Sequence, residues 1–257
     1  MASKQVTDRQ KSARAVVAAA ETHAADIATG VKRELSPHLH KGETFPDVAL
    51  LVRLISRRLH ADVTALVDAD QAHEKELSDD AAPREDRDTA ASKIRSILVD
   101  VRAAVDATYG AKGLTLLGLD QAVPVDPSVL ATTADAISKA LRDASIKLAK
   151  PKRAGMKIDR AAFADEIDAE LPALKKALAN VAKEEREREV TQRAKNAAME
   201  KNDATFSRGA GWLAASCMVA GLDDIGSKVR PSGRRPGRTA STDEEEDGAP
   251  PEGKGEG

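Results

Sequence analysis

The sequence predicts an all-α protein: a bundle of about five to six helices, mostly antiparallel, followed by a disordered C-terminal tail. The main reason is an apolar pattern with spacings of three and four residues that recurs along most of the 257 residues. An α-helix completes a turn in about 3.6 residues, so this spacing places a narrow apolar stripe on one helix face, where it has to be buried. The clearest stripe consists of Phe163, Ile167, Leu171, Leu174, Leu178 and Val181.

Composition agrees with a bundle whose core is built from small and aliphatic side chains. Hydrophobic residues make up 41% of the chain and charged residues 32%, whereas aromatic residues make up only 2%. So few aromatics disfavour a stacking surface for single-stranded nucleic acid and an aromatic-lined ligand pocket. The formal net charge of -2 gives no global attraction to nucleic acid or to an anionic membrane.

Turn signals between the stripes set the bounds of the expected helices. Their ranges are 7–35, 45–77, 84–109, 127–149, 160–201 and 204–226. The first ends before Pro37, because the residue preceding a proline is pushed out of the helical region. The second follows Thr44 as N-cap and has Pro46 in its first turn, where the missing N–H costs nothing. Pro83, with polar residues before it, separates the second helix from the third.

The second half of the chain contains one segment that breaks the helical pattern. Residues 110–126 combine three glycines with several leucines and are too apolar for a solvated loop. We expect a compact turn there, with a short helical piece at 114–119 that plugs one end of the bundle. Asp126 and Asp159 are suitable N-caps for the next two helices. Residues 183–201 carry opposite charges one turn apart, which predicts a solvent-exposed helical extension.

The predicted domain organisation is a helical bundle at 1–227 and a disordered tail of mixed charge at 228–257, which is rich in Pro, Gly and Ser. A short internal similarity suggests that the bundle consists of two helical hairpins, 7–109 and 126–226. Stripes of this kind are also typical of coiled coils and pack equally well within one chain or between chains.

Neither of two apolar stretches predicts a membrane or secretory segment. The run at 15–20 is too short for a signal peptide and is flanked by Asp8 and Glu21, which favours a helix. The longest uncharged stretch, 209–222, is too short and too rich in Gly and Ala to span a bilayer. We therefore expect a cytoplasmic protein without a membrane partner.

The sequence favours a protein that is not an enzyme and needs no cofactor, because no catalytic motif is present. Gly209-Ala210-Gly211-Trp212-Leu213-Ala214 matches a dinucleotide-binding pattern by its letters alone, but no strand precedes it. We interpret these residues as close packing of the last helix, with Trp212 as its anchor. Cys217, the single cysteine, excludes a disulfide within the chain and is expected to be a buried, inert thiol.

Metal binding is one alternative. A metal site in a helical bundle commonly combines Glu-x-x-His pairs from two helices, and Asp70-Gln71-Ala72-His73 is a single approximate match. His23, His60 or His73 would supply the ligands. Because no second pair exists, no metal ligand is assigned.

A basic segment, KVRPSGRRPGR, is the best functional lead. Its cations are the candidate contacts to nucleic acid or to a partner: Lys228, Arg230, Arg234, Arg235 and Arg238. Arginines spaced by Gly and Pro can follow a DNA minor groove and neutralise phosphates, and 150–153 offers a second basic segment. The acidic run at 243–247 competes for the same arginines, which favours a solubilising tail.

The sequence therefore favours a non-enzymatic structural or protein-interaction bundle. Its partner would be an unidentified protein or a second copy of the chain. A nucleic-acid-associated protein that uses the basic segment and a metal-binding bundle are the two alternatives.

Overall fold

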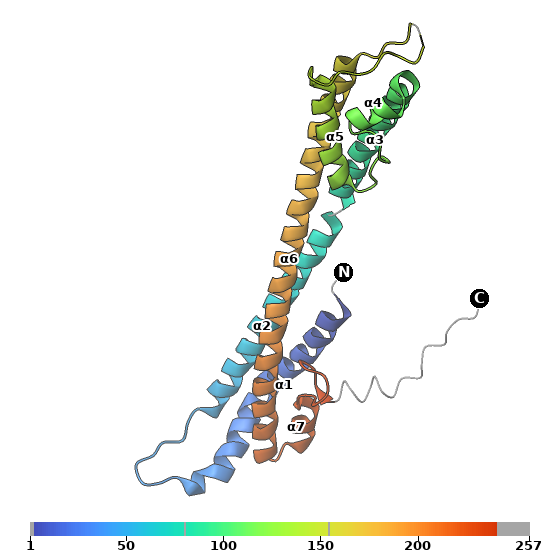
Figure 1. Ribbon diagram of the computed structural model, residues 1–257. Helices are drawn as coiled ribbons and strands as arrows, with labels where there is room; N and C mark the ends of the chain where they lie inside the picture. The colour runs from blue at the N-terminus through green and yellow to red at the C-terminus, as the bar shows by residue number, and fades with distance from the viewer. Residues whose placement is uncertain (1–2, 80, 154, 241–257) are drawn as a thin grey trace, which may run out of the picture. The chain divides into compact units, whose positions relative to one another are not determined.

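The computed structural model describes residues 3–79, 81–153 and 155–240, and these residues are almost entirely helical (Figure 1). The helices in chain order are α1 (Lys4–Leu35), α2 (Val48–Asp79), α3 (Ala81–Tyr109), α4 (Ala111–Leu116), α5 (Pro127–Arg142), α6 (Arg160–Val219) and α7 (Asp223–Val229). The described residues contain no strand beyond one isolated β-bridge. The predicted fold class, an all-α multi-helix bundle, is confirmed.

The two expected helices at 160–201 and 204–226 are largely one continuous helix, α6, which runs on to Val219. The polar residues Asn202 and Asp203 looked like a break, but Asn202 is buried and Asp203 binds Arg9 of α1 through both carboxylate oxygens. Tertiary contacts therefore hold these two residues in the helix against their modest intrinsic preference.

Two other helix bounds differ because side chains bind the backbone at the helix ends. α5 ends at Arg142 rather than at 149, and Arg160 donates to the carbonyl oxygens of Ala140 in its last turn and of Asp143 just after it. α2 begins at Val48 because Asp47, not Thr44, acts as its cap: Oδ1 of Asp47 accepts the N–H of Leu50 at 2.9 Å.

The chain forms two compact units, and each is described by itself. Unit 1 comprises residues 1–75 and 189–257, and unit 2 comprises residues 76–188. These bounds differ from the hairpins expected at 7–109 and 126–226, because the second half of α6 packs with α1 and α2 instead of with its neighbours in the sequence.

Unit 1 is built on α1, α2 and the second half of α6, with α7 beside α1 (Figure 1). Ser3, just before α1, contacts Asp70 late in α2, so these two helices are antiparallel. The core consists mainly of Ala, Val and Leu, with Phe206 as its largest fully buried side chain.

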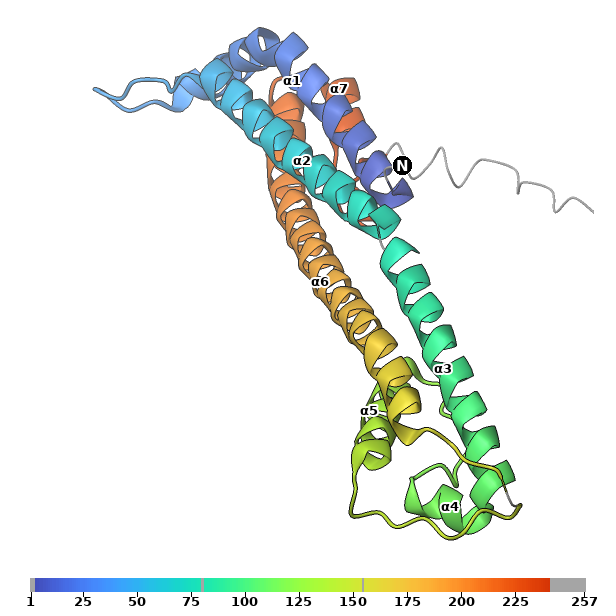
Figure 2. The same cartoon turned by 90° about the horizontal axis from the view of Figure 1, so that it is seen from above.

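Unit 2 is built on α3, α5 and the first half of α6, and α4 lies beside the C-terminal end of α3 (Figure 2). Leu117 and Leu119 are buried in this core, so the leucine plug expected within 110–126 is confirmed for these two residues. The short helical piece itself lies slightly earlier, at α4.

None of the described helices combines the length and the apolar character that crossing a bilayer requires.

Gly30 permits the closest approach between helices in unit 1. A Cβ atom at this position of α1 would lie 2.6 Å from both the Cβ atom and the carbonyl oxygen of Ala220, which follows α6. Backbone atoms cannot move aside as a flexible side chain can. The tight contact between α1 and the end of α6 therefore requires glycine at position 30.

We expect Gly30→Ala to lower the free energy of unfolding by about 1–3 kcal/mol, because the added methyl overpacks this contact. Gly211→Ala is the matched control: its Cβ would meet only Cγ of Pro231 at 3.8 Å, an ordinary contact. The control should gain up to about 1 kcal/mol from the better helix propensity of alanine. Urea unfolding followed by circular dichroism measures both. Equal stabilisation of the two variants would contradict the close approach.

Candidate functional site

A row of buried polar side chains joins α2 to α6 within unit 1. Asp62, Asp70 and His73 of α2 are only 4%, 0% and 5% exposed. Each meets a polar partner on α6: Lys201 Nζ lies 3.0 Å from Asp62, Lys195 Nζ lies 2.6 Å from Asp70, and Thr191 Oγ1 lies 3.0 Å from His73 Nδ1. Successive partners run in opposite directions along the chain, so α2 and α6 are antiparallel, and the row fixes their register.

Asp70 is the most buried member of this row and has the most partners. Ser3 donates its backbone N–H and its hydroxyl to the carboxylate at 2.9 and 3.0 Å, in addition to the contact with Lys195. Burial alone would raise the pKa of Asp70, but the hydrogen bonds from Lys195 and Ser3 outweigh burial and hold the pKa below 3.8. Asp70 is therefore a charged group that ties the start of α1, α2 and α6 together.

Asp62, about two turns before Asp70 on α2, is also a buried carboxylate with a lowered pKa. Burial would raise its pKa, but hydrogen bonds from Lys201, Arg58 and Thr205 outweigh it, so the pKa lies below 3.8. Nε of Arg58 donates to Oδ2 at 2.8 Å. This carboxylate thus anchors one lysine and one arginine at the surface where α2 meets α6.

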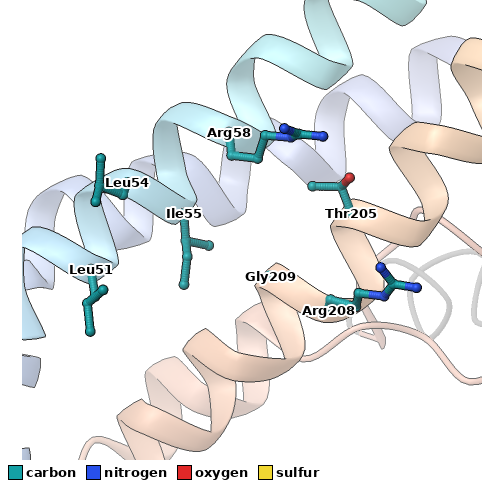
Figure 3. A pocket seen from close by; sticks show the side chains of 7 residues that line it. All are labelled: Leu51, Leu54, Ile55, Arg58, Thr205, Arg208 and Gly209. Carbon is teal, nitrogen blue, oxygen red and sulfur yellow. The ribbon is translucent and has the colours of Figure 1, made fainter.

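A groove beside this row is the candidate functional site. Its volume is about 430 Å³, and it is lined by Leu51, Leu54, Ile55 and Arg58 of α2 and by Thr205, Arg208 and Gly209 of α6 (Figure 3). Leu50, Leu51 and Leu54 remain 45%, 42% and 47% exposed. Nowhere else does the described chain expose three large apolar side chains within five positions. The groove is therefore an apolar surface that the fold of unit 1 leaves open.

Gly209 brings the two helices together at the floor of the groove. A Cβ atom there would lie 3.1 Å from Cγ2 of Ile55 and 3.3 Å from Cδ2 of Leu59, so α2 packs closely over this glycine. Leu59 and the base of Ile55 belong to the apolar stripe that packs inward, whereas Leu51 and Leu54 lie outside it. Close packing below and open leucines above produce the groove.

Two guanidinium groups lie at the same end of the groove, that of Arg58 from α2 and that of Arg208 from α6 (Figure 3). Arg58 is held by Asp62. Arg208, by contrast, forms no hydrogen bond or ion pair with any other residue that the structure describes. Trp212 follows Arg208 by one turn on the same face of α6. It is 38% exposed, so part of the indole ring is open to solvent on this face of α6.

The basic segment that the sequence analysis singled out is folded over residues 228–240. The N–H groups of Ser232 and Ala240 donate to the carbonyl oxygens of Arg238 and Arg230, which closes a small hairpin. Arg238 pairs with Asp8 of α1, and Thr239 is buried beside Ser12. Residues 228–240, which were expected to belong to the tail, are therefore folded against α1. The acidic run at 243–247 lies outside the described residues.

Within this hairpin the five predicted contact residues differ in their surroundings. Lys228, Arg230 and Arg234 are exposed, whereas Arg235 and Arg238 are partly buried. Their role in binding nucleic acid stays a prediction. Of the second basic segment, 150–153, Lys152 binds the end of α3: its backbone N–H donates to Thr108 O at 2.8 Å and its Nζ to Asp106 O at 2.9 Å.

The residues of the approximate metal motif have protein partners instead: Asp70 contacts Lys195, and His73 contacts Thr191. His23 lies beside Asp26 on α1, and His60 is exposed.

Among the described residues, one group of three candidate metal ligands lies within 4.8 Å of one another. It consists of Glu76, Glu184 and Glu187 in unit 2. Lys183 Nζ lies 3.3 Å from Glu187, and this contact raises the pKa of Lys183. The three carboxylates thus belong to a partly exposed ion-pair network.

The structure places Cys217 in the core of unit 1, where burial raises the pKa of its thiol. The expected burial of this thiol is confirmed, whereas its lack of reactivity stays a prediction. The Gly209-Ala210-Gly211 run lies in the middle of α6, so it forms no loop that could cradle a phosphate.

Comparison with protein-family models, curated protein sequences and solved structures finds no match to this chain.

Sequence reasoning did not identify the groove residues, although one signal was present. Leu50 and Leu54 lie off the predicted stripe of the second helix, which runs through Ile55 and Leu59. Apolar residues on a second face of one helix indicate a second packing surface. Which helix would lie beside them could not be foreseen, because α6 is more than a hundred residues away in the sequence.

We expect Asp70→Asn to lower the free energy of unfolding at neutral pH by about 3–5 kcal/mol, because Lys195 would remain buried without its counter-ion. The folded-state pKa of Asp70 is depressed below 3.8, so its contribution is present above pH 3.8 and is lost as the pH falls through the folded-state value. Denaturant titrations should therefore show the difference from the parent protein shrinking below pH 3.8.

The matched control for this variant is Asp68→Asn, since Asp68 lies on the same helix but is exposed. Its free energy of unfolding should stay within about 0.5 kcal/mol of that of the parent protein, both at neutral pH and below pH 3.8. A difference for Asp70→Asn that does not change with pH would contradict the assigned role of the carboxylate charge.

Proposed function

We propose that this protein is a non-enzymatic interaction protein that binds a helix of another protein in the groove between α2 and α6. One observation carries the proposal: Leu50, Leu51 and Leu54 stay more than 40% exposed beside a groove of about 430 Å³. Clustered exposed apolar side chains of this kind mark interaction surfaces, because burying each of them against a partner lowers the free energy of the complex.

The shape of the groove supports a helix as the bound element. Its walls are two antiparallel helices, and a third helix can pack its own apolar stripe into the space between them. A small molecule is less well suited, because pockets for such ligands usually enclose most of the ligand surface. Leu51 and Leu54 are both more than 40% exposed, so the groove is open and would leave much of a small ligand in contact with solvent.

The chemistry of the lining supports binding rather than catalysis. Arg58 and Arg208 are the ionisable side chains that line the groove, and an arginine stays protonated at physiological pH. The nearest buried carboxylate, Asp62, is already bound by Lys201 and Arg58. This set offers anchoring contacts but no general base or nucleophile.

We expect Leu54→Asp to abolish partner binding while leaving the fold intact, because Leu54 is 47% exposed and contributes little to the core. The measurement is quantitative mass spectrometry of proteins that co-purify from nuclease-treated native lysate. The partner recovered with the parent protein should be lost with Leu54→Asp, and circular dichroism should show an unchanged melting curve.

Val99→Asp provides the matched control. Val99 lies on α3 in unit 2, is not among the residues that line the groove, and is 50% exposed. This variant places the same charge on a comparably exposed position and should retain the partner. If Leu54→Asp and Val99→Asp recover the same proteins as the parent, the groove is not the binding surface and the proposal fails.

A further inference from the structure

We infer that the groove selects an acidic amphipathic helix: one whose apolar face fits Leu51, Leu54 and Ile55 and whose carboxylates meet Arg58 and Arg208. The inference depends on the proposed function and names the chemistry of its partner. Its basis is the way in which charge and apolar surface are separated along the groove.

The apolar part of the groove sets the first requirement. Leu51 and Ile55 extend from α2 toward α6 at one end, next to the helix face that carries Gly209 (Figure 3). An incoming helix has to present large aliphatic side chains at spacings of three and four residues to fill this space. Trp212, one turn beyond Arg208 on α6, adds partly exposed aromatic surface on that side.

The charged end of the groove sets the second requirement. Two cations, Arg58 and Lys201, bind the carboxylate of Asp62, and a third, Arg208, lines the groove from α6. Because Asp62 is bound by both Arg58 and Lys201, its single negative charge does not balance all the positive charge at this end of the groove. An incoming carboxylate would complement the remaining positive charge, whereas an incoming ammonium group would be repelled.

Arg208 is the group that discriminates between these partners. It forms no ion pair or hydrogen bond with any described residue, and it points from α6 into the same end of the groove as Arg58 (Figure 3). A guanidinium presents several donors in a planar fork that matches a carboxylate in two parallel hydrogen bonds. Arginine beside aromatic and aliphatic surface is also the composition of energetically important interface positions.

A second copy of the chain fits this surface less well. In the described residues, no helix away from the groove exposes a row of large apolar side chains. A second copy would therefore have to present its own groove. Both surfaces would then bring the same arginines to the interface, and like charges brought together there oppose association.

The test uses two synthetic helical peptides of about 20 residues, a length at which an isolated helix can form. Both carry leucine at i, i+3 and i+7. The first has glutamate one turn away from the leucines, and the second has lysine at the same positions. Fluorescence anisotropy measures the affinity of each peptide for the full-length protein and for the variants Arg208→Glu and Leu54→Asp.

We expect the acidic peptide to bind the parent protein at least about tenfold more tightly than the lysine peptide, and we expect Arg208→Glu to reverse that order. Leu54→Asp should abolish binding of both. Arg208 forms no hydrogen bond or ion pair with other described residues, so Arg208→Glu should fold normally, which circular dichroism checks. The control Arg14→Glu makes the same charge change at an exposed position of α1 and leaves Arg208 in place, so it should leave the preference unchanged.

The two failures can be told apart. If both peptides bind equally well and both are lost with Leu54→Asp, the groove accepts helices without regard to charge; the inference is overturned while the proposed function stands. If neither peptide binds, or if binding persists in Leu54→Asp, the acidic helix is not the occupant of the groove. The lysate experiment with Leu54→Asp and Val99→Asp then decides the proposed function independently.

Discussion

The buried ion pair between Asp70 and Lys195 is the contact on which the arrangement of unit 1 depends. Its two charges are removed from water, and each is compensated only while α2 and α6 keep one register. Ser3 binds the same carboxylate, so the beginning of α1 is held by the same group. The polar row adds directional contacts to a core made mainly of small aliphatic side chains, whose packing is not directional.

The groove follows from this register. With α2 and α6 fixed relative to each other, Ile55 and Leu59 lie over Gly209 and close the floor. Leu51 and Leu54 are then left on the outer face of α2, since no other described helix of unit 1 covers them. A shift of one turn would move a side chain other than hydrogen to the position of Gly209 and separate the two helices.

Charged side chains make up a third of the chain, and several of them bind the backbone rather than solvent. In unit 2, Lys152 binds carbonyl oxygens at the end of α3, Arg160 those at the end of α5, and Arg95 those of Pro124 and Val125. The last carbonyls of a helix have no partner within it, and a cation there also meets the negative end of the helix dipole. Basic segments that look like nucleic-acid contacts in the sequence, such as 150–153, therefore take part in ending helices.

The amino-acid sequence alone predicted the all-α class, most of α1, α2 and α3, the caps at Asp126 and Asp159, the buried plug at Leu117 and the burial of Cys217. Each of these depends on residues close together in the chain: stripe periodicity, a capping side chain, or glycines next to leucines. Only the tertiary structure decided that α6 continues through Asn202, that residues 228–240 fold against α1, and that α2 and α6 form a groove. Those features require contacts between residues more than a hundred positions apart, such as Arg9 with Asp203, Asp8 with Arg238 and Ile55 with Gly209. A local pattern shows which face of a helix is apolar, but not which distant segment covers that face or leaves it open.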